Sequence, residues 1–225
     1  MVTKERNPSL RSLRSLVKRL SKFYADSGRS FPWRESTADN YARIVSEVLL
    51  QQTRAETVSA IFDSFILRYP NWETLSKARI NELQNFIKPL GLWRRRSFAL
   101  KALAQEITRS EKLPSERAQI EALPAVGQYV ANAIELFCFE RPRPLLDVNF
   151  ARVLERYYGP RSHSDIRHDP FLQKTAQRIV EIGNPKKTNW SILDLGAKVC
   201  TARNPNCQAC PLRRGCKYAH YRIGA

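Results

Sequence analysis

The sequence predicts an all-α protein, because three features of its 225 residues favour helices over strands. Apolar side chains recur at every third or fourth position through most of the chain, which is the period of an amphipathic helix. No segment shows the alternation of apolar and polar residues that is typical of a strand. Most glycines and prolines fall between the periodic segments, where they begin or end helices. A chain of this length can bury a proper core in one or two domains.

The first predicted helix begins at a capping asparagine and a first-turn proline, Asn7 and Pro8, and ends before Gly28. Its apolar stripe runs from Leu10 to Phe23. Five basic residues lie on the same helix, and a solvated face explains them about as well as a functional surface: Arg11, Arg14, Lys18, Arg19 and Lys22. The pattern places further helices at about 41–53, 58–69, 72–77, 80–88, 95–109, 170–182 and 188–200, with one more on each side of a loop at 141–149.

The charge balance indicates a polyanionic partner. Lys and Arg number 38 against 21 Asp and Glu, which gives a net charge of +17 and a pI of about 10.1. Nucleic acid fits this imbalance best, and a membrane surface is the alternative. No apolar run approaches the length of a spanning helix. The first ten residues contain no apolar core of a signal peptide, so a cytoplasmic location is expected.

Five cysteines in a reducing compartment indicate a metal site or catalysis more than disulfides. Four of them, Cys200, Cys207, Cys210 and Cys216, have six, two and five residues between them in one short loop. Four thiolates so placed can enclose a single metal centre. Zinc usually requires two close pairs of cysteines, and this loop has one. Cys138 lies on an apolar helix and is expected in the core.

The segment 120–158 is the most informative part of the chain. It predicts a helix, a tight hairpin, a second helix, an extended loop with one acid, and a third helix. The hairpin is Leu123-Pro124-Ala125-Val126-Gly127, and its turn directs backbone N–H groups outward at a helix N-terminus, where a phosphate can bind. Two prolines then exclude a continuous helix through 141–144. A single carboxylate, Asp147, follows among apolar residues.

The runs LPAVGQYVANAI and LLDVNFARVLER resemble the helix-hairpin-helix, Gly/Pro-rich loop and aspartate signature of the endonuclease III and MutY superfamily of base-excision DNA glycosylases. Ala125 departs from the pattern, since the family usually has glycine there, which costs the hairpin backbone freedom. The cysteine spacing is similar to the [4Fe–4S] loop of the same superfamily. The resemblance extends from Phe31 to Cys216.

The resemblance implies an all-α, two-lobed endonuclease III-like fold. Residues 28–148 would form a six-helix barrel with the hairpin, and residues 1–27 and 149–225 would form the [4Fe–4S] cluster lobe. Double-stranded DNA with a mismatched or damaged base would bind against the hairpin, with the target nucleotide flipped into the cleft between the lobes. The expected protein is a cytoplasmic, nucleoid-associated monomer.

Three catalytic residues follow from the resemblance. Asp147 would stabilise positive charge at the sugar and position the attacking water. Glu47 lies in SEVLLQQT, which is similar to the stretch that holds the second catalytic acid of the MutY branch, and it would assist the leaving base. Tyr129 stands where the lyase members have a Schiff-base lysine. A phenol cannot form an imine, so a monofunctional enzyme without AP lyase activity is expected.

The same comparison implies a set of DNA contacts. Leu92, at a loop tip beside three arginines, either acts as a wedge in the base stack or closes a helix C-terminus. The expected contacts are Gln51, Gln52, Leu92, Arg94, Arg95, Arg96, Val126, Gly127 and Gln128. Two positions of the base pocket match Ala55 and Trp190.

The base that leaves is the hardest part to predict. Tyr129 and Ala55 are similar to the glycosylases that remove thymine or uracil mismatched with guanine, which is the favoured interpretation. Gln51 and Gln52 are typical of MutY, so an adenine glycosylase without the C-terminal domain of that branch is the alternative. A non-catalytic iron–sulfur DNA-binding regulator is a third hypothesis, and the presence of both Glu47 and Asp147 speaks against it.

Overall fold

The computed structural model describes residues 7–223, which divide into two compact units. One unit contains the described residues up to Arg29 and from Arg141 onward, and the other is Ser30–Glu140. Within residues 7–223 the regular structure is helical and no strand is present, so the all-α prediction is confirmed. The described part of the chain contains no helix with the length and apolar character of a membrane span.

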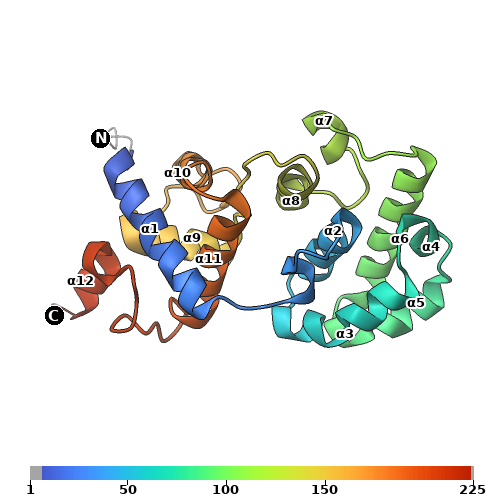
Figure 1. Cartoon of the computed structure of the whole chain (residues 1–225), viewed down its shortest axis with the longest axis horizontal. Helices are drawn as coiled ribbons and strands as arrows, with labels where there is room; N and C mark the ends of the chain where they lie inside the picture. Colours follow the sequence, from blue (N-terminus) through green and yellow to red (C-terminus); the bar gives the residue numbers. More distant parts are fainter. Residues whose placement is uncertain (1–6, 224–225) are drawn as a thin grey trace. The chain divides into compact units, whose positions relative to one another are not determined.

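The internal unit is a bundle of short helices (Figure 1). Its elements are η1 (Pro32–Arg34), α2 (Asn40–Leu49), α3 (Ala55–Arg68), α4 (Trp72–Ser76), α5 (Ile80–Ile87), η2 (Lys88–Leu90), α6 (Trp93–Arg109), α7 (Arg117–Glu121) and α8 (Gln128–Cys138). The hairpin between α7 and α8 occurs where the sequence predicts it.

The other unit combines both ends of the described chain, and α1 packs along α11 in it (Figure 1). Its elements are α1 (Leu10–Ser27), α9 (Val148–Tyr158), α10 (Pro170–Val180), α11 (Pro185–Lys198), η3 (Arg213–Gly215) and α12 (Lys217–Ile223). The sequence analysis did not anticipate α12.

Several helix ends differ from the predictions, and three of them have a local reason. The cap of α1 is Ser9, whose hydroxyl accepts from the Ser12 N–H, whereas the Asn7 amide oxygen accepts from Arg178. Helix α2 ends at Leu49 because the chain turns into a left-handed conformation at Gln52. Helix α11 begins at Pro185, since Asn184 caps it by accepting from the Lys187 N–H.

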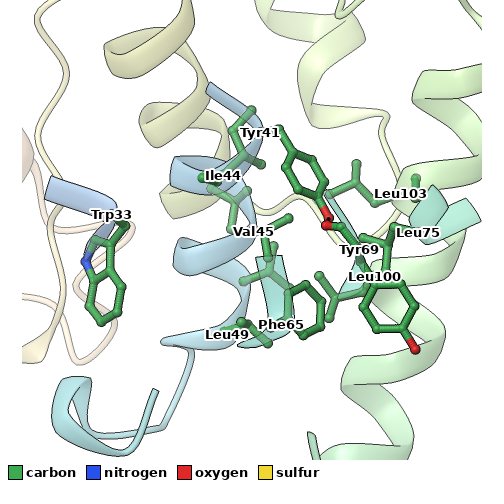
Figure 2. Packing of buried hydrophobic residues seen from close by; sticks show 14 of the residues in the cluster. Trp33, Tyr41, Ile44, Val45, Leu49, Phe65, Tyr69, Leu75, Leu100 and Leu103 are labelled. Carbon is green, nitrogen blue, oxygen red and sulfur yellow. Dashed lines mark hydrogen bonds between the residues drawn. The ribbon is translucent and has the colours of Figure 1, made fainter. Parts of the chain in front are cut away.

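The core of the internal unit lies around α2. Figure 2 shows Tyr41, Ile44 and Val45 of this helix in one hydrophobic cluster with Phe65, which is fully buried. The Tyr41 hydroxyl donates to the Tyr69 carbonyl at 2.5 Å, and burial raises the pKa of Tyr41. The phenol therefore gives the core a satisfied polar group, and the apolar stripe of α2 is buried throughout.

The second core is formed by α1, α9, α10 and α11. Leu13, Leu16 and Leu20 of α1 are fully buried, as is Phe150 of α9. This burial explains the apolar stripe predicted for the first helix, because every third or fourth side chain faces the core.

The loop before Asp147 belongs to this second unit, although the sequence analysis expected it in the barrel, up to residue 148. Asn189 of α11 binds it on both sides. The Asn189 amide oxygen accepts from the Leu145 N–H at 2.6 Å, and its NH₂ group donates to the Arg143 carbonyl at 2.9 Å. Gln177 of α10 donates to the Pro142 carbonyl at 2.8 Å. These hydrogen bonds place the division of the chain at residue 140.

A buried ion pair joins the end of α1 to α11. Asp194 is fully buried and accepts from the Arg29 backbone N–H at 2.8 Å and from its Nε at 2.7 Å. Removal of the carboxylate would leave the Arg29 guanidinium, which is one-fifth exposed, without this partner in a region of low dielectric.

We expect Asp194→Ala to lower the free energy of unfolding by about 3–5 kcal/mol, since it breaks a buried pair from one side. Denaturant titration followed by circular dichroism measures the change. Glu73→Gln is the control, because Glu73 forms an exposed ion pair with Lys77 and its loss should leave the midpoint unchanged. Equal midpoints for the two variants would contradict the prediction.

Candidate active site and cysteine loop

Asp147 is held at the N-cap of α9 by three hydrogen bonds. One carboxylate oxygen accepts from the Asn149 N–H at 2.9 Å and from the Phe150 N–H at 2.8 Å. The other accepts from the Asn149 side-chain NH₂ group at 2.8 Å. The positive end of the helix dipole also faces this carboxylate. Both oxygens therefore have fixed positions before any substrate binds.

Burial raises the pKa of Asp147 above the ordinary value of an aspartate. The hydrogen bonds from Phe150 and Asn149, and the charge of Arg152, act in the opposite direction but do not outweigh burial. A carboxylate with little water around it interacts strongly with positive charge that develops beside it. The site thus suits a negative charge that stabilises a cationic sugar.

A second layer of hydrogen bonds fixes Asn149. Arg152, one turn along α9, donates to the Asn149 side-chain oxygen at 2.8 Å and to the Gly196 carbonyl at 2.8 Å. Its Nε donates to the Cys200 carbonyl at 2.7 Å. A Cβ atom at Gly196 would lie 2.9 Å from the Asn149 Cβ, so glycine is required for α11 to approach this closely. The aspartate and the cysteine loop are therefore connected through two side chains of α9.

Arg156 holds the cysteine loop from the next turn of α9. Its guanidinium donates to the Thr201 carbonyl at 2.8 Å and to the Ala202 carbonyl at 2.9 Å, and it lies 3.3 Å from the Cys200 Sγ. The Cys216 thiol donates to the Arg156 carbonyl at 3.3 Å. Neither the Arg152 nor the Arg156 role was predicted, although their spacing after Asp147 places both on one face of α9.

The four cysteines of the loop lie close enough to affect one another. Burial, together with the nearby Cys200, Cys216 and Cys207, raises the pKa of Cys210 to about 11. Among residues 7–223 no group of three or more His, Cys, Asp or Glu side chains could hold a single metal ion. A donor set of four thiols without histidine fits a [4Fe–4S] cluster, for which Cys200, Cys207, Cys210 and Cys216 would each provide a thiolate. Cys138 lies in the other unit.

In the internal unit, the structure brings Glu47 and Tyr129 together. Glu47 of α2 is only 4% exposed, and its Oε2 accepts from the Tyr129 hydroxyl of α8 at 3.0 Å. The two residues are 82 positions apart in the sequence. The hydrogen bond orients both an acid and a phenol at the beginning of α8.

Arg96 joins the two loops that contain the expected DNA contacts. It is 5% exposed, and it donates to the Gln51 carbonyl at 2.5 Å, the Gly91 carbonyl at 2.6 Å and the Thr53 hydroxyl at 2.9 Å. The sequence analysis expected Arg96 to contact DNA with its neighbours. Its guanidinium instead points inward to satisfy carbonyls, so Arg94 and Arg95 are the exposed members of the run.

The tips of these loops are exposed and have strained backbones. Gln51 and Gln52 are exposed, and so is Leu92, by 53%. Gln52 has a φ of 56° and Leu92 a φ of 49°, in the left-handed region that costs a residue with a side chain free energy. Such conformations persist because the surrounding hydrogen bonds of Arg96 determine the path of both loops.

The hairpin also contains a left-handed residue, at the position where the family usually has glycine. Ala125 has a φ of 62°, so the turn is kept at a cost in strain. Gly127 caps α8 and is exposed, whereas Val126 is 7% exposed and packs in the core. Val126 therefore supports the hairpin from within, contrary to its expected place among the DNA contacts. Gln128 is half-buried.

Arg117 was not predicted as a site residue, yet it connects the two helices of the hairpin. Its NH1 group lies 2.6 Å from the Asn132 side-chain oxygen and 2.6 Å from the Glu135 carboxylate, which is almost fully buried. No sequence motif marks this contact, because it depends on the angle between α7 and α8.

The two expected base-pocket residues belong to different units. Ala55 is the first residue of α3 and is half-buried. Trp190 of α11 is 8% exposed, and its ring lies 6.3 Å from the Tyr24 ring.

The sequence matches a known family over more than half its length. Residues 45–178 match the HhH-GPD superfamily base excision DNA repair proteins, and residues 200–216 match the iron–sulfur binding domain of endonuclease III. The chain belongs to the HhH-GPD superfamily. It is a base-excision DNA N-glycosylase of the endonuclease III/MutY type with a [4Fe–4S] cluster, as the sequence predicted.

Individual relatives agree with this assignment. The chain is 38% identical to a thymine-DNA glycosylase of Aeropyrum pernix, over 92% of this chain and 95% of the relative. It is 36% identical to a thymine/uracil-DNA glycosylase of Pyrobaculum aerophilum, over 85% of each. The solved structure of a thermostable thymine-DNA glycosylase superposes with a TM-score of 0.85 at 30% identity, covering 95% of this chain and all of that one.

We expect Asn149→Ala to shift the acidic side of the pH–rate profile for base release to higher pH. Asn149 contributes hydrogen bonds that lower the pKa of Asp147, so losing its side chain raises that pKa further above the ordinary value. In the catalytic role expected for Asp147, the carboxylate must be charged to stabilise a cation, so activity should be lost as pH falls through the raised pKa. Single-turnover rates across pH measure this. Asn184→Ala, which removes the cap of α11, is the control, and an equal shift in that variant would refute the prediction.

Each cysteine of the loop should be required for the cluster. We expect anaerobically purified protein to contain about four irons per chain. Cys210→Ser should lose most of this iron and lower the melting temperature, because metal binding contributes to folding. Cys138→Ser is the matched control and should keep its iron, since Cys138 lies outside the loop. Zinc without iron in the wild-type protein would contradict the assignment.

Proposed function

We propose that this enzyme is a monofunctional glycosylase that removes thymine or uracil mismatched with guanine and leaves the abasic site intact. The observation on which the proposal rests most is the hydrogen bond between Tyr129 and Glu47. By the resemblance, Tyr129 stands where the lyase members of the family have a lysine, and in the proposal the acid that it binds assists the leaving base.

The sugar side of the reaction is assigned to Asp147. Cleavage of an N-glycosidic bond leaves positive charge on the sugar, and a fixed carboxylate stabilises that charge in the transition state. The hydrogen bonds from Asn149 and Phe150 fix the direction of this carboxylate. In the proposal Asp147 also positions the water that attacks the sugar carbon.

The base side is assigned to Glu47, with Tyr129 as the residue that orients it. A departing pyrimidine takes negative charge on its ring, and a nearby hydrogen-bonding acid stabilises it. Tyr129 donates to Glu47 and so fixes the side-chain rotamer of the acid. Because a phenol cannot form an imine with the abasic sugar, the strand should remain intact after base release.

The preference for thymine and uracil is supported by the relatives and by two residues. The relative from Aeropyrum pernix is named for thymine, and the relative from Pyrobaculum aerophilum is named for thymine and uracil. Ala55 and Tyr129 are also the residues that are similar to mismatch thymine glycosylases. The adenine alternative has Gln51 and Gln52 in its favour, and both are exposed at the end of α2.

The proposed DNA contacts are exposed parts of the three loops that contain the left-handed residues Gln52, Leu92 and Ala125. Gln51, Gln52 and Leu92 come from the loops joined by Arg96, with Leu92 as the wedge in the base stack. The backbone at Gly127 and Gln128 would bind a phosphate at the beginning of α8. Arg94, whose guanidinium lies 4.0 Å from the Trp93 ring, and Arg95 add positive charge.

A base-release assay tests the function. Duplexes with G·T, G·U, A·G and A·8-oxoguanine pairs are incubated with excess enzyme, and strand breaks are measured with and without alkali. We expect thymine and uracil release, with breaks only after alkali. Asp147→Asn should slow release at least 100-fold, the loss typical of one transition-state charge, while duplex binding stays within about twofold.

Three outcomes would refute the proposal. Release of adenine in place of the pyrimidines would establish the alternative specificity. Breaks without alkali, together with borohydride-trapped protein, would show a lyase. Binding without release from any duplex would favour the non-catalytic regulator.

A further inference from the structure

The positive charge of the chain is concentrated in one unit. The internal unit, Ser30–Glu140, has 14 Lys and Arg against 13 Asp and Glu, a net charge of +1. The remaining sequence has 24 Lys and Arg against 8 Asp and Glu, a net charge of +16. The unit with the hairpin is therefore almost neutral, and the electrostatic attraction for a polyanion originates in the unit with the cysteine loop.

Helix α1 presents one basic stripe in this unit. Arg11, Arg14, Lys18 and Lys22 are all exposed, and at about 100° per residue they fall within about 80° of one another around the helix. The buried leucines of α1 lie on the opposite side and pack against the core. The stripe is therefore fixed by the same amphipathic pattern that anchors the helix.

Within residues 7–223, the four side chains of the stripe form no ion pair and no hydrogen bond with the protein. Arg19 differs, because it is half-buried and its charge acts on the Tyr157 phenol. On the internal unit, by contrast, several exposed cations pair with carboxylates. Lys77 pairs with Glu73 at 2.6 Å and Arg109 with Glu106 at 2.7 Å. The α1 stripe thus offers unneutralised charge along one line.

The dimensions of the stripe fit a phosphate backbone. From Arg11 to Lys22 the helix rises about 16 Å, at 1.5 Å per residue. Phosphates along one DNA strand follow each other every 3.4 Å of helix axis, so a line of this length can face several of them. The side chains are long and flexible, which suits contacts that position a duplex without recognising its sequence.

We propose that the exposed stripe of α1, formed by Arg11, Arg14, Lys18 and Lys22, is a second docking surface for the phosphate backbone of duplex DNA, separate from the hairpin. It provides non-specific affinity and most of its salt dependence, while the hairpin unit provides the contacts at the target base. This inference rests on the proposed function for the identity of the polyanion.

The test is the salt dependence of binding to a lesion-free duplex, measured by fluorescence anisotropy. Arg11→Gln, Arg14→Gln, Lys18→Gln and Lys22→Gln are combined in one variant, since glutamine keeps helix propensity. Each lost phosphate contact reduces the slope of log affinity against log salt by about 0.9, so the variant should lose about 3 to 4 from the slope. Its affinity at low salt should fall at least tenfold.

The matched control removes the same charge from the internal unit. Lys77→Gln, Arg79→Gln, Arg109→Gln and Lys112→Gln together also take the net charge from +17 to +13. Three of these cations already have carboxylate partners, so the slope should change by less than about 1 and base release should be unchanged. Equal slopes for the two variants would overturn the proposal, because only the overall charge would then matter.

Two further measurements make the test decisive. The pairs Arg11→Gln with Arg14→Gln and Lys18→Gln with Lys22→Gln should each lose about half of the effect, with unchanged thermal melting of all variants. Anionic lipid vesicles form the other arm, and loss of vesicle binding with an unchanged duplex slope would overturn the proposal in favour of a membrane surface. Because the docking test uses a lesion-free duplex, its result does not depend on catalysis. Wild-type binding to this duplex, without base release from the mismatched duplexes, would refute the proposed function and leave the docking surface intact.

Discussion

The hydrogen bonds that the first turn of α9 makes to Asp147 are the constraint on which the rest of the site depends. The backbone N–H groups at this helix end hold one oxygen of the carboxylate, and the Asn149 side chain holds the other. Along the next two turns, Arg152 and Arg156 bind the carbonyls of the cysteine loop. One helix therefore orients the carboxylate that the proposal assigns to the sugar and also holds the loop that contains the four cysteines.

Three of the five non-glycine residues with a left-handed backbone in the internal unit lie in loops that the proposal assigns to DNA. Gln52, Leu92 and Ala125 all adopt left-handed backbones, each at a cost of order 1–3 kcal/mol. Arg96 compensates at two of these loops by donating to their carbonyls from a buried position. Substitution of Arg96 would therefore affect DNA contacts through loop geometry, although the side chain itself is not on the surface.

The distribution of charge between the two units indicates that base recognition and general attraction to DNA are divided between them, which the overall net charge of +17 does not reveal. A nearly neutral hairpin unit can recognise a base by shape and hydrogen bonds without holding every duplex strongly. A strongly positive second unit can attract any duplex and release counterions on binding. Such a division would allow rapid association with undamaged DNA, while the proposed chemistry involves only Asp147, Glu47 and the target base.

The sequence alone determined the fold class, the hairpin, the aspartate and the four cysteines, because each depends on local spacing: helical periodicity, turn residues and ligand intervals. It could not determine which side chains meet across long intervals. The Tyr129–Glu47 hydrogen bond and the Arg117 contacts depend on how helices cross, and the burial of Arg96 and Val126 depends on which face of a loop turns inward. The sequence of a basic run such as 94–96 does not indicate which side chains face water and which bind carbonyls. Only the tertiary structure therefore decided that Arg96 supports the loops while the basic stripe of α1 remains exposed.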